Sequence, residues 1–291
     1  MSQTSAPIAI LGGSGFYEMP GLSDIEELRI DTPYGTTSDP LRRGLLHGQP
    51  VVFIARHGRG HSLLPGELPQ RANFWALASL GVREVLSISA VGSLQQPIEP
   101  LHAVIPDQII DRTNGSRPAT FFGDGVVAHV SFDEPFCPRL SGVFRDAAVT
   151  AGATVHNGGT LVVIEGPAFS TRAESRVYQS WNGSIIGMTA LPEAKLAREA
   201  GICYAMLACV TDYDTWHPDH KSVTVDLVLE NLRRNAAMAA RAVTGAVQSL
   251  PQWAACTCSD SLKTALVTPL QQVSEQRRNE LRPILDRYGA G

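Results

Sequence analysis

Residues 203–214 read Cys-Tyr-Ala-Met-Leu-Ala-Cys-Val-Thr-Asp-Tyr-Asp, and the class of fold can be inferred from this segment. The run Cys203–Val210 is apolar throughout and lacks the alternation of a half-exposed strand. Such a run predicts a β-strand that is buried on both faces. Helices on both sides of a sheet provide that cover in α/β proteins.

Other short apolar runs and helix-like stretches surround this segment along the chain. We expect further strands at Ile8–Leu11, Val51–Ala55, Glu84–Ala90, Ala103–Ile110, Gly159–Ile164 and Ser184–Gly187. Helices are expected at Leu68–Leu80, Leu140–Ala151, Arg172–Trp181, Leu191–Ala200 and Val225–Val247. The pattern predicts a single α/β domain, residues 1–250, with a central mixed β-sheet flanked by helices. Residues 251–291 are expected to form a C-terminal extension whose helical stretch, Gln271–Tyr288, packs on the same domain or at a subunit interface.

The composition of the chain excludes several classes of protein. With 291 residues, a net charge of −4 and a pI near 6.1, the chain lacks the basic character of a nucleic-acid-binding protein. No apolar run reaches the roughly 18 residues that span a bilayer, and the first residues do not resemble a secretion signal. Five cysteines, an odd number, favour a reducing compartment. We therefore expect a cytoplasmic enzyme that binds neither membranes nor nucleic acid.

A glycine-rich turn, Gly12-Gly13-Ser14-Gly15, follows the first predicted strand. Glycines let the backbone N–H groups approach an anion, and the Ser14 hydroxyl adds a donor. A dinucleotide fingerprint is the obvious rival, but its third glycine is replaced here by Glu18. A purely structural turn stays open as the alternative.

A basic segment with two histidines, Ala55-Arg56-His57-Gly58-Arg59-Gly60-His61, follows another predicted strand. The guanidinium and imidazole groups suit phosphate, although a solvated loop would look the same. His57 and His61 have the spacing of a helical metal-binding pair. Gly58 and Gly60 disfavour a helix, and the glutamate of the H-E-x-x-H motif is missing, so we expect no metal site.

Two further segments could line a ligand pocket. In Ser89-Ala90-Val91-Gly92-Ser93, small residues end a buried strand, as in many α/β pockets, but a tight turn would also explain them. In the segment 165–174, Thr171 or Ser170 with Glu174 forms a helix-capping pattern. Phe169 just before it could be a core residue or a platform for a planar base.

Asp212 and Asp214 lie just after the predicted buried strand Cys203–Val210. Two carboxylates in such a place are costly unless they are paired or used, and their repulsion raises the pKa of at least one. A raised pKa suits a general acid or a hydrogen bond to a protonated nitrogen. A solvated turn rich in aspartate is the alternative.

Taken together, these segments resemble the family of methylthioadenosine phosphorylases and trimeric purine nucleoside phosphorylases. The resemblance runs from about Ile8 to Val247, and the segments follow the family's order at similar spacing. Matching strings are 12–15, 55–59, 164–170, 187–189 and 211–214, together with 73–77, 107–113 and 134–138. It implies a glycosyltransferase that cleaves methylthioadenosine with inorganic phosphate as co-substrate, in purine and methionine salvage, without metal or organic cofactor.

The resemblance also implies roles for individual residues and a homotrimer with shared sites. Phosphate would be bound by Ser14, Arg56, His57, Ser89, Ala90 and Thr189. The nucleoside would contact Phe169 and Ser170 at the purine, Met188 at the ribose, His61, Val225, Val228 and Leu229 at the methylthio group, and His129 of a neighbouring subunit. Asp212 and Asp214 would be the catalytic residues at the base, with Asp212 handling the proton on N7.

The base preference follows from two positions within this resemblance. Relatives specific for 6-oxopurines have Glu where this chain has Ser170, and Asn where it has aspartate. A carboxylate accepts a hydrogen bond from a 6-amino group, whereas a 6-carbonyl needs a donor. The pattern therefore favours adenine. Phosphorolysis of methylthioinosine or 6-oxopurine nucleosides, hydrolysis by water, and a non-catalytic nucleotide-binding module are the alternatives.

The pair Cys256-Thr257-Cys258 matches a C-x-C pair found near the C-terminus of some family members from heat-loving organisms. A disulfide between them would close a very small, strained ring. Two free thiols in a loop are the alternative.

Overall fold

The computed structural model describes residues 6–217, 225–250 and 256–288, with the side chains of residues 225–229 outside the description. The strands, in chain order, are β1 (Ile8–Gly12), β2 (Leu22–Leu28), β3 (Leu41–Leu46), β4 (Gln49–Ala55), β5 (Glu84–Ser93), β6 (Ala103–Ile105), β7 (Gln108–Arg112), β8 (Val155–Asn157), β9 (Thr160–Ile164), β10 (Gly183–Gly187) and β11 (Cys203–Asp212). The helices are α1 (Gln70–Ser79), α2 (Pro138–Thr150), α3 (Arg172–Ser180), α4 (Ala190–Glu199), α5 (Val225–Ser249) and α6 (Glu275–Leu285), with short 3-10 turns at Pro65–Glu67 (η1), Thr257–Asp260 (η2), Leu270–Gln272 (η3) and Asp286–Tyr288 (η4).

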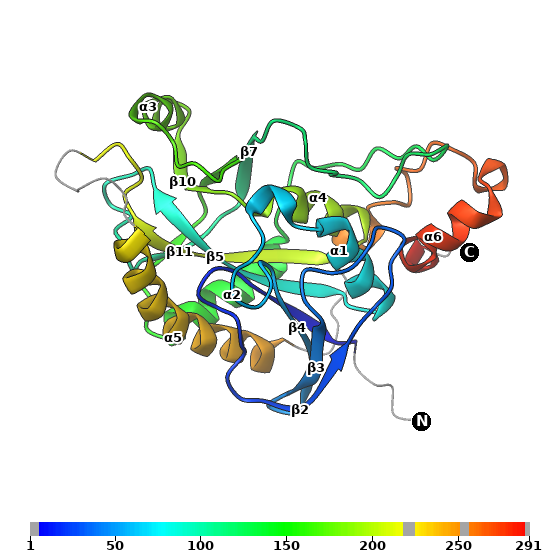
Figure 1. Ribbon diagram of the computed structural model, residues 1–291, viewed down its shortest axis with the longest axis horizontal. Coiled ribbons are helices and arrows are strands. Elements are labelled where there is room, and N and C mark those ends of the chain that lie inside the picture. Colours follow the sequence, from blue (N-terminus) through cyan, green and yellow to red (C-terminus); the bar gives the residue numbers. More distant parts are fainter. Residues whose placement is uncertain (1–5, 218–224, 251–255, 289–291) are drawn as a thin grey trace.

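These strands form one mixed sheet whose order is β2-β3-β4-β1-β5-β10-β9-β7, with β11 on the other side of β5 and β6 and β8 beyond it. The predicted α/β class with a central mixed sheet flanked by helices is confirmed (Figure 1). Every residue of β11 is buried, as the unbroken apolar run predicts.

Helices cover the sheet on both faces, and β1 shows how the sequence divides between them. Ala9 and Leu11 belong to the core that contains Phe74 of α1. Ile8 and Ile10 belong to the opposite core, which contains residues of α2 and α5. Figure 1 shows α2 and α5 lying together along one side of β5 and β11. Alternate side chains along β1 therefore point to opposite faces of the sheet and pack into two separate cores.

The neighbours of β5 change part of the way along it. β1 pairs with β5 at residues 84–87, and β10 pairs with it at Gly92 and Ser93. Within the described chain, no strand pairs with residues 88–91 on that side, because β1 has ended and β10 arrives from the opposite direction. Ligands of α/β proteins commonly bind where strand neighbours change in this way.

The predicted elements are confirmed with small differences at their ends, and one of them is wrong. Ala103–Ile110 forms two strands, β6 and β7, which pair with different neighbours. Pro106 lies at the break, and proline has no N–H with which to continue a ladder. The exposed strand β2 was not predicted, since its charged sequence Leu-Ser-Asp-Ile-Glu-Glu-Leu has no apolar face.

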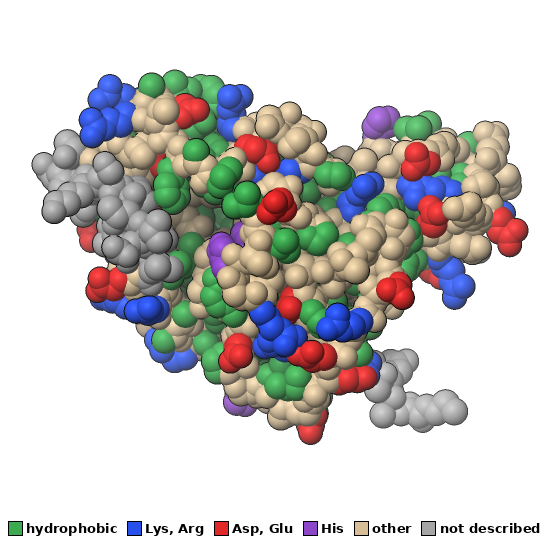
Figure 2. Space-filling view, in the orientation of Figure 1, with side chains coloured by type: hydrophobic (Ala, Val, Ile, Leu, Met, Phe, Trp, Pro, Cys, Tyr) green, Lys and Arg blue, Asp and Glu red, His purple; other side chains and the backbone are tan. Residues whose placement is uncertain are grey.

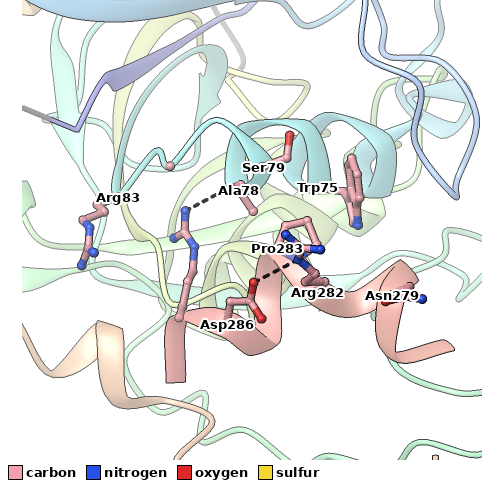
Figure 3. A pocket seen from close by; sticks show the side chains of 10 residues that line it. Trp75, Ala78, Ser79, Arg83, Asn279, Arg282, Pro283 and Asp286 are labelled. Atoms are coloured by element: carbon pink, nitrogen blue, oxygen red, sulfur yellow. Dashed lines mark hydrogen bonds and ion pairs between the residues drawn. The ribbon is translucent and has the colours of Figure 1, made fainter. Parts of the chain in front are cut away.

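The C-terminal segment returns to the body of the protein through α6, which packs beside α1 (Figures 1 and 3). Trp75 Nε1 of α1 donates a 2.7 Å hydrogen bond to the Glu280 carbonyl of α6. Arg287 donates to the carbonyls of Ala78, Val82 and Ala200. The division into a main domain and an extension at residue 250 stays an interpretation of the sequence.

In the part of the chain that the structure describes, no helix is long and apolar enough to cross a membrane.

Candidate active site

A cavity of about 430 Å³ opens beside the part of β5 that lacks a paired strand. Figure 2 shows hydrophobic and histidine side chains gathered on this face, between α3 and α1. The cavity brings together most of the predicted site: Ser14, Arg56, His57, His61, Ser89, Ala90, Phe169, Met188, Thr189, Asp212 and Asp214. Segments that are far apart in the sequence thus meet at one place.

Arg56 is fixed by a buried network at the end of β4. Its side chain is 1 % exposed and that of Glu193, in α4, is 0 % exposed. Arg56 Nε donates to Glu193 Oε1 at 2.5 Å, and Nη2 donates to Glu193 Oε2 at 3.2 Å. Nη1 donates to the Ile88 carbonyl and Nη2 to Ser87 Oγ. Four of the five guanidinium N–H groups are engaged in these described contacts, which leaves one on Nη1 for a ligand.

Glu193 is held in turn by neutral donors from two other elements. Gln70 Nε2 of α1 donates to Oε1 at 3.0 Å, and the Tyr204 hydroxyl of β11 donates to Oε2 at 2.7 Å. A buried ion pair needs such additional hydrogen bonds, because the two charges have left water. The network orients Arg56 before any ligand arrives.

The glycines of the turn after β1 are needed for close approach. A Cβ on Gly12 would lie 2.1 Å from the Phe16 carbonyl oxygen. A Cβ on Gly13 would lie 2.4 Å from the Ile88 carbonyl oxygen and 2.6 Å from Arg56 Nη1. The turn therefore packs directly on the arginine, with Ser14 at the cavity wall.

His57 and His61 stack on each other, with ring centres 4.4 Å apart and planes at 10°. Burial, followed by the charge of Arg56, lowers the pKa of His57 to about 4, so this ring is neutral at pH 7. Its Nδ1 lies 2.9 Å from the Leu63 carbonyl, which can only accept, so Nδ1 carries the proton and Nε2 is an acceptor. His61 Nδ1 pairs with the Tyr17 hydroxyl at 2.8 Å.

Two hydroxyl groups complete this polar end of the cavity. Ser89 Oγ and Thr189 Oγ1 lie 3.3 Å apart, although they come from β5 and from the turn before α4. One guanidinium N–H, three hydroxyls and a neutral imidazole thus line one end. Such a set suits an oxyanion that accepts several hydrogen bonds.

Asp212 and Asp214 lie at the end of β11, and both are 7 % exposed. Asp212 Oδ2 accepts from Thr211 Oγ1 at 2.7 Å, and Oδ1 accepts from the Asp214 backbone N–H at 2.8 Å. Burial raises the pKa of the Asp212 carboxyl. Burial also raises the pKa of Asp214 to about 6, and the charge of Asp212 acts in the same direction. Ser175 Oγ of α3 donates to Asp214 Oδ2.

The backbone around these aspartates is tied to its neighbours. A bulge in the pairing of β11 with β5 sets Asp212 opposite Gly92, where a Cβ would lie 3.0 Å from Asp212 Oδ1. Asn231 and Asn235 of α5 donate to the carbonyls of Thr211 and Val210, at 2.7 and 3.0 Å. The carboxylates are therefore fixed at a buried wall, which contradicts a solvated turn.

Phe169 and Met188 form apolar parts of the wall, and Phe169 is 49 % exposed. Arg117 connects their segments: Nε donates to Glu165 Oε1 at 2.7 Å, Nη2 to the Glu165 carbonyl at 2.5 Å, and Nη1 to the Met188 carbonyl at 2.6 Å. Ser170 is buried behind the wall and does not line the cavity, and its Oγ has no hydrogen-bond partner among the described residues.

Besides Ser170, four predicted residues are not brought to the cavity by what is described. The side chains of Val225, Val228 and Leu229 lie outside the described residues, although α5 begins at Val225. Leu232, one helical turn after Val228, does line the cavity. His129 is exposed on the segment between β7 and α2, and its backbone N–H donates to the Ala265 carbonyl. Its contact with a nucleoside in a neighbouring subunit stays a prediction.

Sequence reasoning missed Glu193, Arg117, Tyr17 and Leu232. Of these four, only Leu232 could have been predicted from the sequence, since it continues the helical spacing of residues 225, 228 and 229. Glu193 lies in an ordinary helical sequence, and its partner is 137 residues away.

The chain was compared with known proteins. The family model described as the phosphorylase superfamily matches residues 7–248. S-methyl-5′-thioadenosine phosphorylase from Chloroflexus aurantiacus is 54 % identical over 98 % of this chain and 99 % of that protein. The enzyme of the same name from Geobacter sulfurreducens is 49 % identical over 97 % of this chain and 98 % of that protein.

Solved structures similar to this chain are also methylthioadenosine phosphorylases. A methylthioadenosine phosphorylase from an Antarctic soil metagenomic library is 47 % identical with a TM-score of 0.91, over 97 % of this chain and 100 % of that one. A mutant of the adenosine/methylthioadenosine phosphorylase of Schistosoma mansoni, solved with methylthioadenosine, is 35 % identical with a TM-score of 0.78, over 84 % of this chain and 91 % of that one. The chain belongs to the phosphorylase superfamily and, within it, to the methylthioadenosine phosphorylases.

Proposed function

We propose that this chain cleaves S-methyl-5′-thioadenosine with inorganic phosphate, giving adenine and 5-methylthioribose 1-phosphate. One observation carries the proposal: a single cavity joins the fixed Arg56, with its hydroxyl and imidazole neighbours, to two buried carboxylates at another wall. The enzyme is then a pentosyltransferase of the purine nucleoside phosphorylase type. Phosphate is a co-substrate, and the proposed reaction uses no metal or organic cofactor.

Phosphate is assigned to the polar end, at Ser14, Arg56, His57, Ser89, Ala90 and Thr189. Because the neutral His57 offers an acceptor at Nε2, a phosphate oxygen that carries a proton suits this position. Arg56, with one N–H left over, and the three hydroxyls can donate to the remaining oxygens. The ion therefore meets both donors and an acceptor in fixed positions.

In the reaction, the bond between C1′ and N9 of adenine breaks ahead of full bonding to the nucleophile. The ribose gains positive charge, which the bound phosphate stabilises before one of its oxygens forms the new bond to C1′. Positioning of opposite charges supplies most of the acceleration. The bonding electrons leave with the base, so adenine departs as an anion unless a proton is placed on it.

The two aspartates are assigned to that proton and to recognition of adenine. We assign the N7 proton to Asp212 and the 6-amino group to Asp214. The raised pKa values of both carboxyls support this assignment, since each group is closer to holding a proton at neutral pH than an exposed aspartate is.

Phe169 is assigned to the purine and Met188 to the ribose. The methylthio group is assigned to His61 and to the start of α5, at Val225, Val228 and Leu229. We further propose a homotrimer in which His129 reaches a neighbour's nucleoside, a cytoplasmic location, and a role in purine and methionine salvage. The exposure of His129 is compatible with a contact between subunits.

The first test is the dependence of cleavage on phosphate. We expect adenine and 5-methylthioribose 1-phosphate in equal amounts when methylthioadenosine and phosphate are both present, and no cleavage in phosphate-free buffer. Cleavage without phosphate would indicate a hydrolase. Methylthioinosine and inosine serve as controls for the base, and faster turnover of either would overturn the assignment of adenine.

Asp212→Asn should lower kcat by about 10²- to 10⁴-fold, because the variant cannot place a proton on the departing base. Asp31→Asn, at an exposed aspartate outside the cavity wall, is the matched control and should leave kcat unchanged. Steady-state kinetics with saturating phosphate measures both. Unchanged turnover in the Asp212 variant would refute the role.

The raised pKa of Asp214, about 6 against 3.8, also predicts a cost in stability. Above pH 6 the folded protein carries a buried charge that the unfolded chain carries in water, whereas below about pH 4 both states are protonated. Asp214→Asn should therefore stabilise the protein above pH 6, by at most about 3 kcal/mol, and this gain should disappear as the pH falls towards 4.

Asn suits this position, because it tolerates the left-handed backbone at residue 214 (φ +42°) and can still accept from Ser175. Denaturant unfolding of wild type and variant at pH 4, 6 and 8 measures the difference. A variant that is less stable than wild type at pH 8 would show that the buried charge does not destabilise the folded protein.

A further inference from the structure

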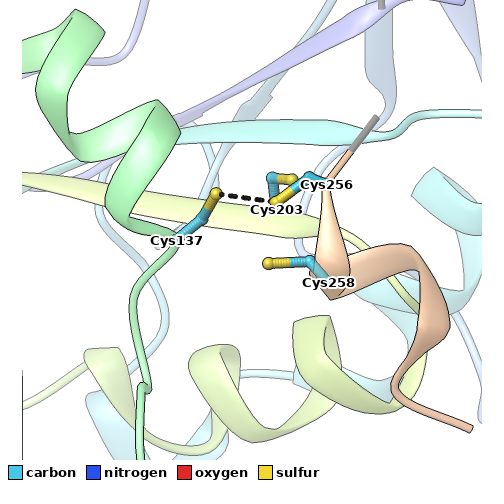
Figure 4. A group of neighbouring side chains, drawn as sticks. All are labelled: Cys137, Cys203, Cys256 and Cys258. Atoms are coloured by element: carbon cyan, nitrogen blue, oxygen red, sulfur yellow. Dashed lines mark hydrogen bonds between the residues drawn. The ribbon is translucent and has the colours of Figure 1, made fainter. Parts of the chain in front are cut away.

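Four of the five cysteines meet at one place, far from the cavity (Figure 4). The sulfur atoms of Cys137, Cys203, Cys256 and Cys258 all lie within 4.8 Å of one another. They come from three parts of the chain: the residue before α2, the first residue of β11, and the segment around η2. All four are free thiols.

The arrangement has the dimensions of a metal site. A zinc ion bound by four thiolates has Zn–S bonds of about 2.3 Å, which sets its sulfur atoms about 3.8 Å apart in a tetrahedron. The Sγ atoms of Cys137 and Cys256 are 3.5 Å apart, and the other separations do not exceed 4.8 Å. Small side-chain rotations therefore suffice to bring all four sulfur atoms to bonding distance of one ion.

The surroundings of the cluster suit negative charge. Arg139 Nη2 lies 3.7 Å from Cys203 Sγ, and Arg198 Nη1 lies 3.8 Å from Cys258 Sγ. Arg139 also pairs with Glu84, so its charge is shared. Cys137 precedes the first turn of α2, where the helix dipole favours an anion. Such outer donors are typical of tetrathiolate sites, in which two positive charges of the ion meet four negative thiolates.

We propose that Cys137, Cys203, Cys256 and Cys258 bind one zinc ion in a structural site. Four soft thiolates in a closed tetrahedron select zinc, and a closed site leaves no position for substrate. Binding releases the four thiol protons to solvent and leaves a site of net charge −2, beside two guanidinium groups. This departs from the expectation of a chain without metal, which rested on the spacing of His57 and His61 and on the family resemblance.

A zinc ion here would cross-link three segments of the chain. It fastens residues 256–258, where the described C-terminal segment begins, to the starts of α2 and β11. Asp212 lies nine residues further along β11, which corresponds to about 30 Å of strand. The site therefore acts on the attachment of the C-terminal segment and not on the reaction.

The first experiment measures metal in the full-length protein, purified with a thiol reductant and without chelator. We expect one zinc per chain by elemental analysis. After exchange with cobalt(II), we expect the thiolate charge-transfer and visible d–d bands of a tetrahedral cobalt site. Removal of the ion by a chelator should lower the melting temperature and speed proteolytic removal of the C-terminal segment.

Cys258→Ala should lose the zinc, whereas Cys209→Ala should retain it. Cys209 is the matched control, since it is a buried cysteine of β11 outside the cluster. If Cys258→Ala does not fold, the zinc content and cobalt spectrum of the wild type decide.

Thiol titration after denaturation with chelator separates the alternatives. Five free thiols together with bound zinc support the site. Five thiols without metal, or fewer thiols because disulfides have formed, would overturn it.

Discussion

The buried ion pair between Arg56 and Glu193 is the constraint on which the site depends. It joins the end of β4 to α4, and the donors from Gln70 and Tyr204 bring α1 and β11 into the same network. Removing one partner of such a pair typically costs about 3–5 kcal/mol, because an uncompensated charge is left in the core. The guanidinium is therefore held in place by the fold itself, without any ligand.

The cavity beside β5 is lined in part by this arginine. Because β1 ends at Gly12 and β10 approaches from the opposite direction, residues 88–91 have no strand on that edge, and the cavity opens there at residues 89–91. The glycines after β1 let the turn pack on Arg56, and the bulge in β11 sets the aspartates at the far wall. The proposed anion site and the proposed proton donor thus lie at one cavity, and the predicted stability cost of the buried Asp214 charge would accompany that function.

The sequence was sufficient for the elements and for most of the cavity wall, but not for what holds the wall in place. Unbroken apolar runs predicted β1, β5 and β11, and helical spacing predicted α5. The charged strand β2 has no such pattern, and Pro106 divides a run that composition alone left whole. Glu193, Arg117 and the partners of Cys256 and Cys258 act across long separations in sequence. Local patterns carry no information on such contacts, which exist only once the sheet has formed.

The central claim is that Glu193 prepares Arg56 for phosphate, and the phosphate dependence of Glu193→Gln tests it most directly. Glutamine keeps the size of the side chain and one acceptor for Arg56, but it removes the charge and one of the two hydrogen bonds that fix the guanidinium. With folding confirmed by thermal unfolding, the account predicts that KM for phosphate rises about 10-fold or more, while KM for methylthioadenosine changes little. An unchanged KM for phosphate in the folded variant would contradict it.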